Sequence, residues 1–455
     1  MRVEQQSRRY SLPTEDARLD ALFESIPEPV HVDLTNIESA CRTLNQTAAT
    51  IFLMDDQRRR IIRRIFGAAE ALAATATPDV VTFNRRLMSL KPWLDLNPYM
   101  LCVSGLAGVG KSALMDALAG FLDKQDSTIE IGSVVGSARA MRRFRASHGA
   151  KLSDVLNSLL AGPEGGSEGS GPRQKSATVS QVIKSLYREA SFLLLADELQ
   201  EISASSTASS EVTKLLLKLG SLGPVLVYCC NYSLLHKLSK RNQEEKDRVL
   251  GQRVILRPYA SSTPEWHRYL KVLTACFDQT FQIDPERVSG KEQRTEAEIL
   301  YGMTFGIPRK VVMLLDISLR LAKPGDGTIR VTMDDLQRAY RSSAFAVSRY
   351  EIERLFKQVN DGRAGDQDLH SPLDPVDGLT ERDDAQRAKA EQVQRKLAET
   401  EARAQYAAMT AAERAALSER TPSETLPTKK ANKPKPPKRK EGDLAKGQAL
   451  FEKLC

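Results

Sequence analysis

The chain has 455 residues, a formal net charge of +8 and a sequence pI near 9.1. A chain of this length exceeds one ordinary domain, so two or three folded units are expected. The basic balance permits a nucleic-acid partner without requiring one. No apolar run is long enough to span a bilayer, and the first ten residues, MRVEQQSRRY, lack the apolar core of a signal peptide. We therefore expect a cytoplasmic protein that does not enter a membrane.

The first two segments of the chain are predicted to differ in secondary structure. Residues 1–95 are expected to be helical, because stretches such as DDQRRRIIRRIFGAAEALAA repeat apolar residues at helical spacing. Residues 96–260 alternate strand and helix signals, and strands are expected at 99–104, 128–135, 191–196, 224–230 and 253–259. Such alternation predicts an α/β fold, with a parallel five-stranded sheet covered by helices.

Two more segments follow this α/β region. Residues 261–358 are expected to form a helical unit, with Thr263 and Pro264 opening one helix and Thr332 and Asp335 forming a capping box at another. Residues 359–455 contain a linker, a solvated helix at 381–419 and the basic, proline-broken stretch KKANKPKPPKRK, which is expected to be a disordered tail. The insertion AGPEGGSEGSGP at 161–172 is expected to be a surface loop.

The segment LCVSGLAGVGKSALMDALAG, residues 101–120, joins an apolar strand to a helix through a glycine-rich turn. Residues 105–112 fit the pattern G-x-x-x-x-G-K-[ST] of a phosphate-binding loop. Glycines leave backbone N–H groups free to converge on an anion, and the following helix adds its positive end. Lys111 is expected to reach the β- and γ-phosphates of ATP, and Ser112 to place a hydroxyl on Mg²⁺. The expected nucleotide contacts are Gly105, Gly108, Val109, Gly110, Lys111, Ser112 and Ala113.

A second apolar strand ends in two acids, in SFLLLADELQEI. Its place after the phosphate-binding loop favours a Walker B motif over a buried strand that happens to end in two surface acids. Asp197 is then expected to hold Mg²⁺ through water, and Glu198 to orient or deprotonate the attacking water. This division of labour predicts nucleotide hydrolysis rather than binding alone.

Four polar residues downstream are candidates for sensing the nucleotide. Asn231 follows the apolar strand PVLVYCC, where it either contacts the attacking water or ends the strand as a turn residue. Arg248 and Arg253, in KDRVLGQRVIL, are candidates for an arginine finger that reaches a neighbouring subunit; the sequence does not choose between them, and surface solvation is the alternative. Arg309, in FGIPRK, either reads the γ-phosphate or is an ordinary surface arginine.

Basic residues concentrate in SARAMRRFRASHGAK, which carries almost no acid. Such a segment favours contacts with the phosphates of double-stranded DNA, without base-specific readout; a solvated surface is the alternative. RRRIIRRIF, residues 58–66, is a second cluster with the same two interpretations. The expected DNA contacts are Arg139, Arg142, Arg143, Arg145 and Lys151.

The order of these features resembles that of an AAA+ ATPase. Within that class, GLAGVGKS, LLLADELQEI, SHGAKLSDVLNSLL and GIPRKVVMLLDISLRLA resemble segments of the TnsC/TniB family of transposition ATPases, over about residues 10–350. The resemblance implies an AAA+ P-loop core with a helical lid, and a homo-oligomer, ring or filament, that forms on target DNA with ATP. It also implies transposase and target-selection proteins as partners. The alternative function is an AAA+ protein-remodelling or signalling ATPase. A GTPase is not favoured, because no Asn-Lys-x-Asp element is found.

Overall fold

The computed structural model describes residues 3–32, 36–89, 99–131, 134–146, 151–161, 177–199, 208–277, 280–289, 293–322, 330–361 and 365–373. The chain divides into two compact units, Met1–Glu381 and Arg382–Cys455, and all described residues belong to the first. The predicted basic tail, the solvated helix and residues 162–172 of the predicted surface loop lie outside the described residues.

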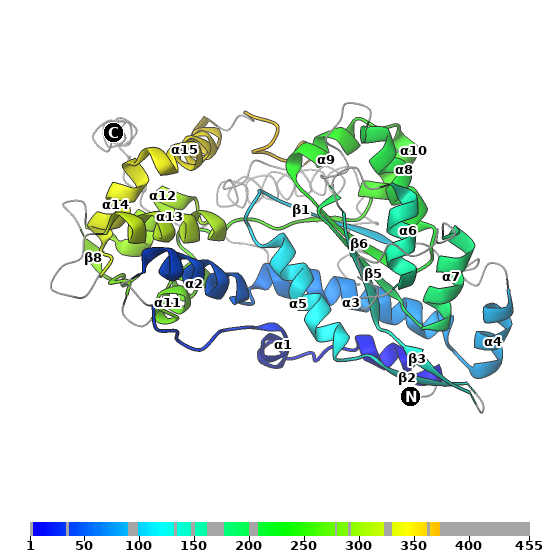
Figure 1. Cartoon of the computed structure of the whole chain (residues 1–455). Coiled ribbons are helices and arrows are strands. Elements are labelled where there is room, and N and C mark those ends of the chain that lie inside the picture. The colour runs from blue at the N-terminus through cyan, green and yellow to red at the C-terminus, as the bar shows by residue number, and fades with distance from the viewer. Residues whose placement is uncertain are drawn as a thin grey trace, which may run out of the picture. The chain divides into compact units, whose positions relative to one another are not determined.

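A parallel five-stranded sheet is the centre of the first unit, with helices on either side of its strands (Figure 1). The strand order is β4-β5-β6-β1-β7, and every neighbouring pair is parallel. The strands are β1 (Met100–Ser104), β4 (Met141–Arg145), β5 (Leu193–Asp197), β6 (Val225–Cys230) and β7 (Arg253–Ile255). The strands β1, β5 and β6 are buried at every residue, as expected for strands covered on both faces. The predicted α/β fold is confirmed.

The strand expected at 128–135 does not belong to this sheet. β2 (Ser127–Ile131) and β3 (Val134–Ala138) pair with each other in a separate antiparallel sheet. The edge position is taken instead by β4, whose sequence is MRRFR. Arg142 and Phe144 are its buried residues, and this spacing of two is that of a strand. The sequence prediction missed β4 because one of its two inward positions carries an arginine.

The N-terminal segment forms helices, most of which pack on the α/β core, whereas α2 (Ile37–Thr50) packs on the helical unit. The other helices of this segment are η1 (Val3–Tyr10), α1 (Asp16–Phe23), α3 (Asp56–Ala76) and α4 (Val80–Met88). Phe23 of α1, Phe66 of α3 and Phe121 of α5 form one cluster, with ring centroids 4.8–5.8 Å apart. The core helices are α5 (Lys111–Asp123), α6 (Leu152–Ala161), α7 (Val179–Arg188), α8 (Ala208–Gly220), α9 (Tyr232–Ser239) and α10 (Gln243–Leu250).

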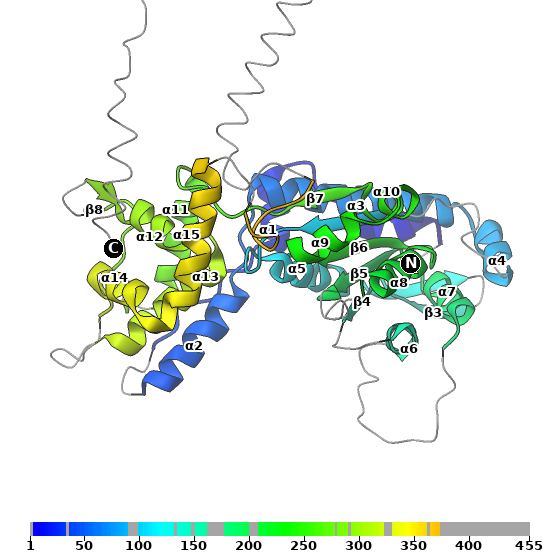
Figure 2. The ribbon, with the colours of Figure 1, turned by 90° about the horizontal axis from the view of Figure 1, so that it is seen from above.

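The predicted helical unit contains α11 (Pro264–Ala275), β8 (Val288–Ser289), β9 (Arg294–Thr295), α12 (Glu296–Thr304), α13 (Pro308–Leu321), α14 (Met333–Arg341), η4 (Ser343–Phe345) and α15 (Ala346–Asp361). The predicted helix start at Pro264 and the capping box of Thr332 with Asp335 are confirmed. Helix α2 lies beside α13 (Figures 1 and 2), where Asn45 Nδ2 donates to Asp316 Oδ1 at 2.9 Å. The N-terminal segment therefore packs on both the sheet and the helical unit. Within the described residues, no helix is long and apolar enough to cross a membrane.

Candidate nucleotide-binding site

A cavity of about 720 Å³ lies at the carboxyl ends of β1, β5 and β6, where parallel α/β sheets bind ligands. Segments far apart in the sequence meet there: the β1–α5 loop, the ends of β5 and β6, and the first turn of α13. The predicted residues that line the cavity are Gly108, Gly110, Lys111, Ser112, Ala113, Asp197, Glu198, Asn231 and Arg309. Most of the predicted site is thus one continuous surface.

The β1–α5 loop has the backbone of a phosphate-binding loop. Gly108 and Gly110 have φ of 84° and 104°, in the left-handed region that glycine adopts without strain. Gly105 approaches another segment so closely that an added Cβ would lie 2.3 Å from the carbonyl oxygen of Leu256. Helix α5 begins at Lys111, so its unpaired N–H groups and the positive end of its dipole belong to this loop.

Lys111 is held by its own loop. Its Nζ donates to the carbonyl oxygens of Gly105 and Leu106, both at 2.8 Å. Burial lowers the pKa of this ammonium, and neighbouring Arg309 lowers it further, while Asp197 opposes the shift. Phosphate oxygens form stronger, charge-assisted bonds with an ammonium than neutral carbonyls do, so an anionic ligand in this cavity would improve the surroundings of Lys111.

The acids of the predicted Walker B motif follow the buried strand β5. Asp197 is 2% exposed, and its Oδ1 accepts from the backbone N–H of Glu198 at 2.9 Å. In the described part of the chain, its Oδ2 is buried without a hydrogen-bond partner, and Arg143 Nη2 and Arg145 Nη2 approach it only to 3.7 and 3.9 Å. A buried carboxylate oxygen of this kind, in the cavity that Ser112 also lines, fits a hard cation such as Mg²⁺.

Glu198 has a strained backbone. Its φ is 57°, in the left-handed region that residues other than glycine seldom adopt. Such strain is of order 1–3 kcal/mol and is often found at functional sites. The conformation lies directly after β5 and places Glu198 among the cavity-lining residues. The strained backbone is therefore a second indication, besides the cavity lining, that Glu198 is a functional residue of this site.

Asn231 directly follows β6, where it caps a helix and faces the cavity. It caps α9, because its Oδ1 accepts from the backbone N–H of Leu234 at 3.0 Å and from Ser233 Oγ at 2.8 Å. It also lines the cavity. The cap fixes the orientation of the side-chain amide, and contact with the nucleotide or water stays a prediction.

The predicted arginines separate into two groups. Arg309 lies in the first turn of α13, where its backbone N–H donates to the Gly108 carbonyl oxygen at 3.3 Å and its side chain lines the cavity. Arg248, at the end of α10, and Arg253, in β7, are not among the cavity-lining residues. Arg253 Nη2 donates to the Leu373 carbonyl oxygen at 3.3 Å. Their action on a neighbouring subunit stays a prediction.

The predicted DNA-binding segment is largely the edge strand β4. Arg142 is 7% exposed, and its Nε and Nη2 donate to Glu189 Oε2 at 3.0 and 2.6 Å. A buried guanidinium bound to a carboxylate is not accessible to DNA phosphates, so the prediction that Arg142 binds DNA is wrong. Arg143 is paired with Asp116 at 2.6 Å, whereas the Arg145 side chain is 60% exposed. Arg139 is partly exposed and Lys151 is exposed.

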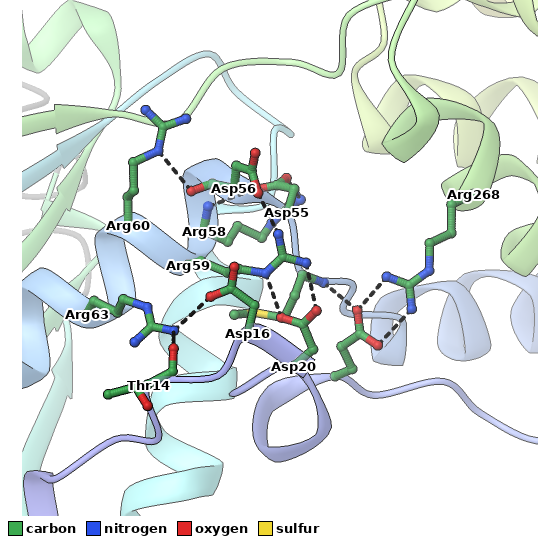
Figure 3. Close-up of polar contacts among 12 residues, drawn as sticks. Thr14, Asp16, Asp20, Asp55, Asp56, Arg58, Arg59, Arg60, Arg63 and Arg268 are labelled. Carbon is green, nitrogen blue, oxygen red and sulfur yellow. Dashed lines mark hydrogen bonds and ion pairs between the residues drawn. The ribbon is translucent and has the colours of Figure 1, made fainter. Parts of the chain in front are cut away.

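The second basic cluster is paired within the chain (Figure 3). Arg59 Nε and Nη2 donate to the two carboxylate oxygens of Asp20 at 2.8 and 2.7 Å, and Arg63 Nη2 is 2.7 Å from Asp16 Oδ1. These ion pairs join α3 to α1, so they favour a structural role for the cluster over contact with DNA.

The sequence prediction missed the apolar part of the cavity and two of its cations, Arg58 and Arg320. The apolar part is lined by Ile51, Phe52, Leu53, Tyr259, Tyr269, Val312 and Met313. Arg58 lies where this part meets the β1–α5 loop, over the rings of Phe52 and Tyr259 and close to Gly110. Apolar and aromatic side chains around a concave site suit a flat group such as a nucleotide base. No local motif marks these residues, and in the sequence Arg58 is one member of the basic stretch RRRIIRRIF.

Part of the chain matches a known protein family. Residues 95–238 match a family model described as an AAA domain. No curated protein matches the sequence. Solved structures with similarity include the Orc1 protein of Aeropyrum pernix in complex with DNA, at 15% identity over 62% of this chain and 67% of that one, with a TM-score of 0.36. Cdc6p of Pyrobaculum aerophilum is 12% identical over 62% and 77% of the chains, with a TM-score of 0.37.

The AMPPCP-bound DnaA of Aquifex aeolicus is 13% identical over 70% of this chain and 77% of that one, with a TM-score of 0.33. Likenesses this distant establish no shared function, so the AAA-domain match and the site geometry carry the assignment. The parallel sheet, the phosphate-binding loop and the acids after β5 define an AAA+ P-loop fold. Residues 95–238 therefore match an AAA domain in sequence, and the described part of that range has the corresponding fold.

Proposed function

We propose that this chain is an ATP-hydrolysing AAA+ switch that assembles on duplex DNA in transposition and links target-site selection to transposase recruitment. The proposed ATPase activity is supported by one observation: Lys111, Asp197, Glu198, Asn231 and Arg309 all line the same cavity. The transposition part rests on the resemblance of the sequence to the TnsC/TniB family.

In the proposed reaction, the β1–α5 loop binds the polyphosphate of ATP, and the apolar part of the cavity takes the base. Lys111 and Arg309 neutralise phosphate charge from α5 and α13. Ser112 and Asp197 would hold Mg²⁺, which would neutralise part of the phosphate charge. Glu198 orients the attacking water and accepts its proton, and Asn231 positions the water or the γ-phosphate.

Nucleotide binding is proposed to control assembly. Arg309 belongs to the helical unit and Lys111 to the core, so one nucleotide that contacts both favours one arrangement of the two. Arg248 or Arg253 of a neighbouring copy would complete the site, which couples the oligomer to ATP thermodynamically. The assembly is a ring or a filament.

DNA contact is proposed for the accessible cations Arg139, Arg145 and Lys151. Contacts to phosphates are independent of base sequence and weaken with salt, by about −0.9 in the slope of log K against log salt for each phosphate neutralised. Combined replacement of Arg139, Arg145 and Lys151 by alanine should weaken DNA binding about equally for all sequences and flatten that slope. An unchanged affinity at two salt concentrations would contradict this interface.

Two substitutions test the ATPase assignment. Lys111→Ala should abolish ATP binding, whereas Glu198→Gln should keep binding and lose about 10²- to 10⁴-fold in turnover, because it removes a catalytic base. Equal hydrolysis by Glu198→Gln and the parent chain would refute the role of Glu198. Addition of duplex DNA then separates the two candidate functions. Stimulation of hydrolysis supports the DNA-bound switch, and its absence supports an ATPase that acts on a protein partner.

A further inference from the structure

We infer that Arg58, on the N-terminal helix α3, is a nucleotide-binding residue whose guanidinium donates to a phosphate oxygen of the nucleotide. This inference rests on the proposed function, because it requires a nucleotide in the cavity. It gives the N-terminal segment a direct part in nucleotide binding, in addition to the contacts that the β1–α5 loop provides.

The Arg58 guanidinium lies beside the phosphate-binding loop. Arg58 lies in the first turn of α3 and lines the same cavity as Gly110 and Lys111. Its Nη2 lies 3.6 Å from the point that a Cβ on Gly110 would occupy. Gly110 directly precedes Lys111 in the phosphate-binding loop, so the guanidinium is next to the part of the site where phosphate oxygens are expected.

Among the described residues, the Arg58 side chain has only part of its N–H donors hydrogen-bonded. Arg58 is 5% exposed, and both polar partners found for its side chain, the Asp55 carboxylate and the Tyr259 hydroxyl, bind Nη1. In the described part of the chain, Nε is buried without a hydrogen-bond partner. Nε and Nη2 form the edge with which arginine binds a carboxylate or phosphate through two parallel bonds. Arg142 uses this edge on Glu189, and Arg59 uses it on Asp20.

The Arg58 guanidinium is positively charged and held in a fixed position. Burial disfavours a charged guanidinium, but Tyr259 and Asp55 outweigh this effect and raise the pKa of Arg58, so the group is a cation. The guanidinium also lies over the rings of Tyr259 and Phe52, at 5.1 and 5.7 Å, which hold it in place. A buried cation with an N–H donor that lacks a partner raises the free energy of the folded chain, and a hydrogen bond to an anionic oxygen lowers it again. Phosphate supplies that oxygen, whereas a base or ribose supplies only neutral acceptors.

The experiment compares ADP and adenosine, which differ by the phosphates alone. Binding is measured with EDTA present, by competition against a fluorescent nucleotide, for the parent chain, Arg58→Gln and Arg59→Gln. We expect Arg58→Gln to weaken ADP binding by about ten- to hundredfold and to leave adenosine binding unchanged. Arg59→Gln is the matched control, because it removes the same group from the same helix at a position that does not line the cavity. It should leave ADP affinity near the parent value.

Three results would overturn the inference: unchanged ADP affinity in Arg58→Gln, equal loss of ADP and adenosine affinity, or the same loss in Arg59→Gln. The last two would show that Arg58 only supports the fold. If Arg58→Gln fails to fold by circular dichroism, the ratio of ADP to adenosine affinity in Arg58→Lys gives the same decision. ADP binding that is absent in the parent, or unchanged in Lys111→Ala, would instead count against the proposed function.

Discussion

Removal of the Arg142 side chain is expected to destabilise the fold strongly, although Arg142 belongs to a segment that reads as a nucleic-acid surface. The side chains of Arg142 and Glu189 are 7% and 13% exposed and are joined by two bonds to one carboxylate oxygen. Among the described residues, Arg142→Ala leaves the largely buried Glu189 carboxylate with the Ser185 hydroxyl, at 3.2 Å, as its side-chain hydrogen-bond partner. Loss of one partner of a buried pair costs about 3–5 kcal/mol.

The assay is thermal unfolding, with urea unfolding as a second measurement. The folded unit spans Met1–Glu381, and at an unfolding entropy of about 2.1 cal/mol/K per residue 1 kcal/mol shifts Tm by about 1.3 °C, so Arg142→Ala should lower Tm by about 4–6 °C. Arg145→Ala is the control on the same strand, and its exposed side chain predicts a change within about 0.5 kcal/mol. The double variant Arg142→Ala/Glu189→Ala should be less destabilised than the sum of the two single variants.

Equal Tm values for Arg142→Ala and Arg145→Ala would refute this reasoning. They would show that the Arg142–Glu189 pair contributes nothing net to stability. The outcome also decides how DNA-binding data are interpreted. If Arg142→Ala unfolds the chain, the loss of DNA binding in that variant does not identify a DNA contact. The DNA interface is therefore tested with substitutions at Arg139, Arg145 and Lys151 only.

Three more predictions follow from the site. Gly108→Ala should lose ADP affinity, because its φ of 84° disfavours alanine and the new Cβ would lie 2.6 Å from Arg309 Cβ; an affinity equal to the parent would contradict that contact. ADP affinity should fall as pH rises through the lowered pKa of Lys111, because phosphate binds the ammonium and raises its pKa again, so binding takes up a proton. Calorimetry in two buffers of different ionisation enthalpy measures that proton, and no uptake would contradict the assignment. Either Arg248→Ala or Arg253→Ala should reduce ATP hydrolysis and ATP-dependent light scattering while ADP binding by the monomer persists; no effect from either would end the model of a finger acting on a neighbour.

The sequence alone predicts the parts of the site that are built from neighbouring residues. A strand, a glycine-rich turn and a helix N-terminus are contiguous in residues 101–120, and their N–H groups and dipole act over a few ångströms. The acids after the buried strand β5 are local in the same sense. The structure brings both into one cavity because the carboxyl ends of parallel strands meet at one edge of the sheet.

Only the tertiary structure distinguishes the arginines from one another. In the sequence Arg58, Arg142 and Arg145 are equivalent members of basic clusters, yet two are buried and one is exposed. The difference comes from partners that are remote in sequence: Glu189 is 47 residues from Arg142, and Tyr259 is 201 residues from Arg58. A cation can be buried only where folding supplies an anion or another acceptor. Asp55 is a local partner of Arg58, but the acceptors Tyr259 and Glu189 come from distant parts of the sequence, which no local pattern reveals.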